Sequence, residues 1–276
     1  MYEGKGIMKK LIILGTGNAM ATKVFNTCFL IEFPDGELFL TDAGGGNGIL
    51  RQMEECGADY SRIHNMFVTH GHTDHILGVV WIIRKIASLV NSGKYEGVLN
   101  IYCHDVVKDM LLKMCEMMLK KKDLQNVGKS IIINEVIDGQ VLEFTQMKLT
   151  AFDIFSTKAK QFGYTITFAD DGKVLTCLGD EPYNEVCEKY VRGADWLMSE
   201  AFCKYGDRDR FKPYEKNHST CMEAAKLAEE LGIKNLVLYH TEDKTIATRK
   251  ADYGAESRNY FHGNVFVPDD LDVIIL

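Results

Sequence analysis

Residues 70–75 read His-Gly-His-Thr-Asp-His and follow the apolar run at 66–69. The chain has only eight His in 276 residues, so three within six positions are more than a surface turn requires. Zinc and its first-row relatives prefer imidazole nitrogen and carboxylate oxygen. A strand ending before this segment would place its first two His on a turn, with Thr73 capping the helix that follows. The predicted ligands of one or two divalent ions are His70, His72, Asp74 and His75.

Four further polar residues lie where a predicted strand ends or a predicted helix begins, and loop residues at such points are free to serve a site. Taken singly, each would be interpreted as an ordinary turn residue. Together with the cluster at 70–75, they supply the inventory of a two-metal hydrolase. They are Asp42, Asp180 and His240 after strands, and His218 before a helix.

The bulk composition narrows the class of protein. A net charge of −7 argues against broad nonspecific binding to nucleic acid, although bound divalent cations would add positive charge locally. No segment has the ~18 uncharged apolar residues of a membrane helix, and residues 1–10 lack the features of a signal peptide. Eight scattered Cys without a C-x-x-C pattern predict reduced thiols and a cytoplasmic location. We therefore expect no membrane partner.

The order of apolar runs predicts an α/β fold. Strand patterns with attached helices fill both halves of the chain, which favours two mixed sheets packed face to face with helices outside. The pattern at 75–90 predicts a long buried helix, and that at 220–231 predicts another. We expect one domain over residues 1–276, with residues 1–7 as an extension that precedes a second candidate start at Met8.

The chain resembles the metallo-β-lactamase superfamily of hydrolases, and within it the ribonuclease Z-like branch of phosphodiesterases. The family's H-x-H-x-D-H signature is matched by residues 70–75. The resemblance implies a four-layer αββα sandwich that holds one or two divalent ions, with zinc expected and manganese or iron as alternatives. It also implies that Asp42 supports the ligands from behind, that Asp180 bridges the metals, and that His240 is the late histidine ligand.

The ribonuclease Z-like branch also pairs a glutamate with a histidine that serves the phosphate. The resemblance assigns these roles to Glu200 and His218, with His218 protonating the leaving oxygen. It assigns to Asp74 the orientation and deprotonation of the attacking water. Ser219 and Thr220 begin a predicted helix, where they cap it, bind a phosphate, or do both.

Two departures from the family pattern matter for function. The third histidine ligand expected upstream of Gly163-Tyr164 is missing, and Thr157 stands at the nearest position. Because a neutral hydroxyl is a poor zinc ligand, either the first ion binds weakly or the site works with one tight ion. Between Tyr164 and Asp180 there is room for only one hairpin, so the long arm with which many ribonuclease Z enzymes grip tRNA has no counterpart.

The leading hypothesis is a phosphodiesterase that acts on RNA or on a small phosphodiester. An ester, lactone or thioester hydrolase would use the same ligands without the Glu200–His218 pair. A non-catalytic relative that senses a metal or a ligand is the third reading, motivated by the missing histidine. A homodimer, as in ribonuclease Z relatives, stays open. The basic and aromatic segment 204–216 and the lysines Lys158 and Lys160 are candidate nucleotide contacts, although solvated loops commonly have this composition.

Overall fold

The computed structural model describes residues 8–276, and the predicted extension at 1–7 lies outside the described residues. The chain divides into two compact units, each built on one seven-stranded mixed sheet. A single domain over the whole chain stays a prediction. The first unit contains the described part of Met1–Gly15 together with Phe25–Glu135 and Asp270–Leu276, and the second contains Thr16–Val24 and Val136–Asp269.

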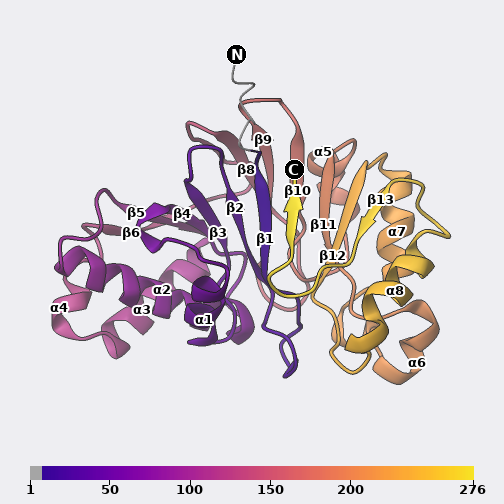
Figure 1. The fold of residues 1–276 in the computed structure, drawn as a ribbon, viewed down its shortest axis with the longest axis horizontal. Helices are drawn as coiled ribbons and strands as arrows, with labels where there is room; N and C mark the ends of the chain where they lie inside the picture. The colour runs from indigo at the N-terminus through magenta and orange to yellow at the C-terminus, as the bar shows by residue number, and fades with distance from the viewer. Residues whose placement is uncertain (1–7) are drawn as a thin grey trace, which may run out of the picture. The chain divides into compact units, whose positions relative to one another are not determined.

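The sheet of the first unit joins strands from both ends of the described chain. Its strands are β1 (Lys10–Gly15), β2 (Cys28–Glu32), β3 (Leu38–Thr41), β4 (Ile63–Phe67), β5 (Leu99–Cys103), β6 (Ile131–Glu135) and β14 (Val273–Ile275). They lie in the order β14-β1-β2-β3-β4-β5-β6. Pairing is antiparallel from β14 to β3 and parallel from β3 to β6. The last strand, yellow in Figure 1, therefore pairs with the indigo first strand.

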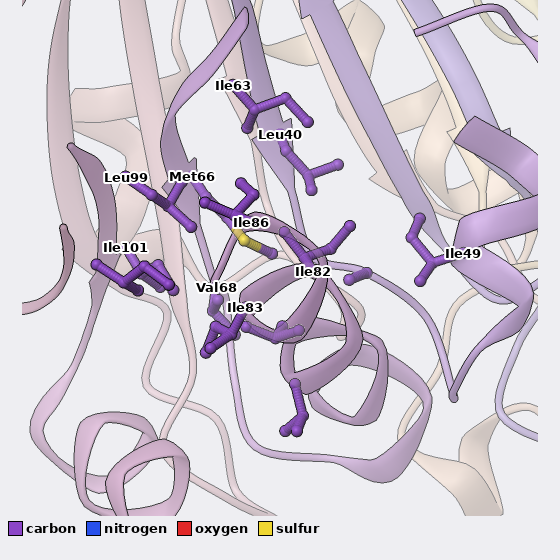
Figure 2. Close-up of a cluster of buried hydrophobic side chains, with 14 of the residues drawn as sticks. Leu40, Ile49, Ile63, Met66, Val68, Ile82, Ile83, Ile86, Leu99 and Ile101 are labelled. Atoms are coloured by element: carbon purple, nitrogen blue, oxygen red, sulfur yellow. The ribbon is translucent and has the colours of Figure 1, made fainter. Parts of the chain in front are cut away.

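The helical elements of the first unit are α1 (Gly48–Glu55), η1 (Tyr60–Arg62), α2 (Thr73–Asn91), α3 (Asp105–Met118) and α4 (Lys121–Leu124). The predicted long buried helix is confirmed as α2. Figure 2 shows its Ile82 and Ile86 facing Met66 of β4 in the apolar core. The expectation that Thr73 caps this helix is wrong, because His72 holds the cap position with extended backbone angles and Thr73 is the first helical residue.

The sheet of the second unit is also mixed. Its strands are β7 (Val141–Glu143), β8 (Met147–Asp153), β9 (Phe162–Phe168), β10 (Val174–Cys177), β11 (Trp196–Glu200), β12 (Asn235–Tyr239) and β13 (Asn264–Phe266). They lie in the order β13-β12-β11-β10-β9-β8-β7. Pairing is parallel from β13 to β10 and antiparallel from β10 to β7.

The helical elements of the second unit are η2 (Glu185–Cys187), α5 (Glu188–Val191), η3 (Tyr205–Asp207), α6 (Arg208–Phe211), η4 (Tyr214–Lys216), α7 (Cys221–Glu230) and α8 (Ile246–Ser257). The capping predicted at the start of α7 is confirmed and takes the form of a capping box, since the Thr220 side chain accepts from the Glu223 amide and the Glu223 carboxylate accepts from the Thr220 amide. The small side chains Ala224, Ala225 and Ala228 let α7 pack closely in the core of this unit.

In both units the predicted site residues lie at the carboxyl ends of parallel strands. Asp42 follows β3 and His70 follows the β4 segment, while Asp180, Glu200 and His240 lie at the ends of β10, β11 and β12. Crevices at such ends are the usual ligand positions of open α/β sheets. Within residues 8–276, none of the helices combines the length and apolar character that a bilayer span demands.

Candidate functional site

The first cluster is organised by Asp42, which ends β3 with a φ of 53°. Non-glycine residues rarely adopt this left-handed conformation, and such outliers gather at functional sites. The Asp42 carboxylate accepts hydrogen bonds from the Thr69 amide and from the Thr69 hydroxyl, each at 2.8 Å. Asp42 therefore fixes the turn that leads into the His-rich segment.

The same carboxylate decides which nitrogen of two imidazoles carries a proton. His75 Nδ1 lies 2.7 Å from Asp42 Oδ2, and because an ionised carboxylate only accepts, Nδ1 carries a proton and Nε2 is the nitrogen left to face other groups. The Thr69 hydroxyl gives its hydrogen to Asp42, so it accepts from His70 Nδ1 at 3.0 Å. His70 Nε2 is thereby turned toward His72. This is the arrangement by which neighbouring groups orient histidine ligands.

The nitrogen and oxygen atoms of this cluster that do not contact Asp42 or Thr69 lie close to one another, as the ligands of a metal ion would. His70 Nε2 and His72 Nδ1 are 2.8 Å apart, so either one of them carries a proton or both face a cation. His75 Nε2 lies 3.4 Å from Asp74 Oδ2. Burial by itself would lower the pKa of His75, but the carboxylates of Asp74 and Asp42 outweigh it and raise that pKa well above its ordinary value. The same carboxylates would favour a divalent cation, which has to displace this proton in order to bind.

Glycine lets α2 approach the loop after β3. The Gly78 amide donates to Gly44 O at 2.8 Å, and the Ala43 amide donates to His75 O at 3.1 Å. A Cβ at Gly78 would lie 1.8 Å from Ala43 O. Only glycine allows this approach, which brings the first turn of α2 against the Asp42 loop.

The second cluster lies at the ends of β10 and β12. Asp180 Oδ2 is 3.6 Å from His240 Nε2, and both side chains are buried. His240 has a φ of 57°, so this unit also places a site residue in the left-handed region directly after a strand. Gly179 has a φ of 82°, and a Cβ there would lie 2.1 Å from Gln161 Oε1. Two turns of restricted geometry therefore bring together a carboxylate and an imidazole.

Glu200 and His218 lie beside this pair. The Glu200 side chain is fully buried, and its Oε1 accepts from the Ser219 amide at 2.6 Å while Oε2 lies 3.5 Å from His218 Nδ1. The Phe202 ring stacks on the His218 ring at 5.1 Å with an interplanar angle of 2°. The rings of His218 and His240 are 5.1 Å apart. His218 is therefore fixed by ring stacking, and its Nδ1 and Glu200 Oε2 are buried within 3.5 Å of each other without forming a hydrogen bond.

Comparison with known proteins assigns the family. Residues 9–258 match the sequence model of the family described as Anti-Pycsar protein Apyc1. The chain belongs to this family. Curated relatives of this Apyc1-family chain include the ribonuclease Z of Methanothermobacter thermautotrophicus, which is 28% identical over 279 residues that cover 84% of this chain and 86% of that protein.

Solved structures give the same fold for this Apyc1-family chain. The metallo-β-lactamase fold protein YhfI from Bacillus subtilis has a TM-score of 0.76 at 19% identity, covering 97% of this chain and 99% of that one. The short form of human tRNase Z has a TM-score of 0.74 at 22% identity, covering 96% and 98%. The predicted superfamily, ribonuclease Z-like branch, fold class and hydrolase class are thereby confirmed, and divalent metal dependence is the rule of that class.

Sequence reasoning missed one residue of the second cluster. Gln161 is fully buried, its Nε2 donates to Asp180 Oδ1 at 2.5 Å, and its Oε1 accepts from the Asp180 amide at 2.8 Å. The side chain thus fixes the Asp180 backbone and one carboxylate oxygen together. No sequence motif identifies a single glutamine as a site residue. Gln161 is the last residue of the segment that lacks the expected histidine. The Gly179 turn, which leaves room for this amide, was the only signal available.

The remaining predicted residues have structural partners. Thr157 is exposed, and its hydroxyl accepts from Asn217 Nδ2 at 2.9 Å. The Ser219 amide binds Glu200, and Thr220 caps α7. Capping is confirmed, whereas phosphate binding by Ser219 and Thr220 stays a prediction. Lys158 donates to the carbonyl oxygen of Lys216, so the Lys158 side chain contacts the end of the 204–216 segment.

Proposed function

We propose that this chain is a metal-dependent phosphodiesterase that cleaves RNA ends or small nucleotide diesters in the cytoplasm. The Glu200–His218 pair beside His240 carries the proposal, because it puts a proton donor next to a proposed metal ligand. An alkoxide leaving group needs such a donor, whereas the thiolate expelled from a thioester does not. The eight cysteines, all free thiols, agree with a reducing compartment.

The proposed ligands come from both clusters. Zinc is the expected ion, since imidazole and carboxylate suit it, with manganese or iron as alternatives. The Thr157 hydroxyl already accepts from Asn217 and is a poor zinc ligand, so we expect the first ion to dissociate more readily. From the family resemblance, we assign His70, His72 and Asp180 to the first ion, and Asp74, His75, His240 and the shared Asp180 to the second.

When bound, such cations would supply Lewis acidity, which offsets charge on the phosphoryl oxygens and makes water more acidic. Asp74 would accept a proton from the attacking water. His218 would donate a proton from Nε2 to the leaving oxygen, with the Glu200 carboxylate stabilising the charged ring from 3.5 Å on the Nδ1 side. Asp42 and Gln161 would keep their neighbouring ligands in position by the hydrogen bonds described above.

The connection between β9 and β10 favours small substrates. β9 ends at Phe168 and β10 begins at Val174, so only residues 169–173 join them. A protruding arm has no place in so short a turn. We therefore rank small diesters ahead of tRNA precursors. A homodimer, common in the ribonuclease Z-like branch, is part of the proposal, and sedimentation of the full chain would test it.

The direct test is turnover of bis(p-nitrophenyl) phosphate by protein reconstituted with zinc or manganese. Asp74→Ala should abolish turnover. His218→Ala should reduce cleavage of a dinucleotide, which has an alkoxide leaving group, by roughly 10²–10⁴-fold, the usual contribution of a general acid, and should reduce cleavage of the p-nitrophenyl ester less. Asp170→Ala, in the exposed turn after β9, is the matched control and should keep full activity.

Three results would replace the proposal. If no phosphodiester is cleaved by protein with its metal sites full, the phosphodiesterase assignment is wrong. If His218→Ala keeps full activity and a lactone or thioester is the better substrate, the ester hydrolase reading takes over. If the purified chain holds far less than one ion and takes up none on reconstitution, the non-catalytic reading is favoured.

A further inference from the structure

Arg249 on α8 is a fully buried arginine that no step of the proposed reaction uses. A guanidinium stays charged in proteins, and taking such a charge out of water carries a large desolvation penalty. Its carboxylate partner, Asp269, lies at 2.9 Å and has a side chain that is 50% exposed. An ion pair with a half-exposed carboxylate is a poor reason to bury Arg249, so we looked for what else this side chain contacts.

The hydrogen bonds of Arg249 join three separate segments of the second unit. Its Nη1 donates to Thr16 Oγ1 at 3.1 Å and to Thr241 Oγ1 at 2.7 Å. Its Nη2 donates to Pro268 O and to Asp269 Oδ1, each at 2.9 Å. A guanidinium has five N–H donors, and the fifth, on Nε, is buried without a hydrogen-bond partner in the described part of the chain. The side chain is therefore placed to connect these segments and not to satisfy all of its own donors.

Thr241 is the residue that these contacts restrain most completely. Its amide donates to Thr16 O at 2.9 Å, and its carbonyl oxygen accepts from the Asn18 amide at 3.1 Å and from Asn18 Nδ2 at 2.8 Å. With the bond from Arg249 to its hydroxyl, each polar group of Thr241 has a partner. Thr241 directly follows His240, which has a φ of 57°. A non-glycine residue keeps such a conformation only where its surroundings fix it.

We propose that Arg249 is a positioning residue that, through the Thr241 hydroxyl, directs the His240 imidazole at a divalent cation. The inference rests on the proposed function, which makes His240 a metal ligand. The backbone angles of His240 decide where its side chain points, and they are set by the bonds on Thr241. Because His240 Nε2 lies 3.6 Å from Asp180 Oδ2, a small rotation of this backbone would separate two proposed ligands.

The decisive test is a pair of substitutions at Thr241. Thr241→Val keeps the shape of the side chain and removes the oxygen that accepts from Arg249, whereas Thr241→Ser keeps that oxygen. Competition between the metal-free chain and a chelator of known affinity gives the Kd for zinc without any turnover. Thr241→Val should raise this Kd by about tenfold, the lower end for groups that orient a ligand, because the effect is indirect. Thr241→Ser should keep the wild-type Kd.

Substitutions on α8 test the other end of the contact. Arg249→Met should raise the zinc Kd at least as much as Thr241→Val. The double variant should be no weaker than Arg249→Met alone, because both changes remove the same hydrogen bond. Lys250→Met is the matched control, since Lys250 Nζ lies 3.3 Å from Asp269 Oδ2 and is the neighbouring cation on the same carboxylate. It should keep the wild-type Kd. If Arg249→Met does not fold, the Thr241 pair decides.

Three results would overturn the inference. They are a wild-type Kd in Thr241→Val, an equal loss of affinity in Thr241→Val and Thr241→Ser, and a loss in Lys250→Met as large as that in Arg249→Met. A wild-type chain that binds zinc but cleaves no phosphodiester would instead reject the proposed function, and the Kd values would still decide the role of Arg249. A wild-type chain that takes up no zinc would reject both.

Discussion

The two clusters reach similar geometry by different routes. The first has its four predicted ligands within residues 70–75, on the turn after β4 and in the first turn of α2. The second takes Asp180 from the end of β10 and His240 from the end of β12, with β11 between these strands. A contiguous cluster can be recognised as a motif from the sequence alone. A dispersed cluster exists only once parallel strands place their carboxyl ends together.

The residues that support the ligands also differ between the clusters. Asp42 is a carboxylate that accepts from His75 and, through Thr69, orients His70. Gln161 is a neutral amide that donates to Asp180. A carboxylate partner makes an imidazole a stronger ligand, whereas an amide donor withdraws charge from a carboxylate oxygen. The difference suggests that the first region contributes more to metal affinity and the second more to geometry.

Substitution of Asp180 is the strongest test of this comparison between the two clusters. Asp180→Asn should lower turnover of bis(p-nitrophenyl) phosphate by roughly 10³-fold, because an amide lacks the charge that bridging cations require. Bound metal measured by mass spectrometry should fall with it. Asp170→Asn serves as the control. If Asp180→Asn keeps wild-type metal content and activity, the first cluster works alone and the division of ligands proposed above is wrong.

Asp42→Asn should have the next largest effect. An asparagine keeps one oxygen but can no longer accept from the Thr69 amide, the Thr69 hydroxyl and His75 Nδ1 together. Loss of such a supporting partner weakens metal affinity by roughly 10–100-fold, and we expect the upper end here. Competition with a chelator of known affinity measures the change. An unaltered metal Kd would contradict the role given to Asp42.

Gln161→Leu tests the corresponding residue of the second region. The change removes both hydrogen bonds to Asp180, and we expect activity to fall by roughly tenfold, the lower end for such partners. Metal affinity should change less than in Asp42→Asn. Gln125→Leu, at an exposed position, is the matched control. A larger loss of metal affinity from Gln161→Leu than from Asp42→Asn would reverse the comparison.

The smallest expected effect concerns the loop that follows His240. Burial alone would raise the pKa of Asp243, but hydrogen bonds from the Thr22 and Lys23 amides and the Lys244 ammonium outweigh it and lower that pKa. A lowered pKa means that Asp243 stabilises the fold above its unfolded-state pKa of about 3.9 and that this contribution is lost as the pH falls. Asp243→Asn should cost about 1–3 kcal/mol at pH 7.

Urea unfolding measures this cost, and the gap between wild type and Asp243→Asn should narrow between about pH 5 and pH 3. A gap that stays constant over this range would show that the carboxylate charge has no part in holding the loop.

Much of the fold was predictable because periodic apolar patterns are local. The long buried helix α2 and the capping box of α7 followed from residues close in sequence. The first and last residues of the helices were harder to predict than the helices themselves, as the N-cap of α2 illustrates. His72 holds the cap position with extended backbone angles, so the ordinary preference for a Thr at the cap did not locate the start of this helix.

The sequence by itself determined the His-rich turn, the strand-end positions of Asp42, Asp180 and His240, and the Glu200 and His218 candidates. Only the tertiary structure decided how Asp42 assigns the protons of two imidazoles, that Gln161 holds Asp180, and that a pocket opens beside His218. The physical reason is the sequence separation of the interacting residues. The types of ligand residue and their local spacing can be seen in the sequence, whereas hydrogen-bond direction and cavity shape depend on side chains that distant strands bring into contact.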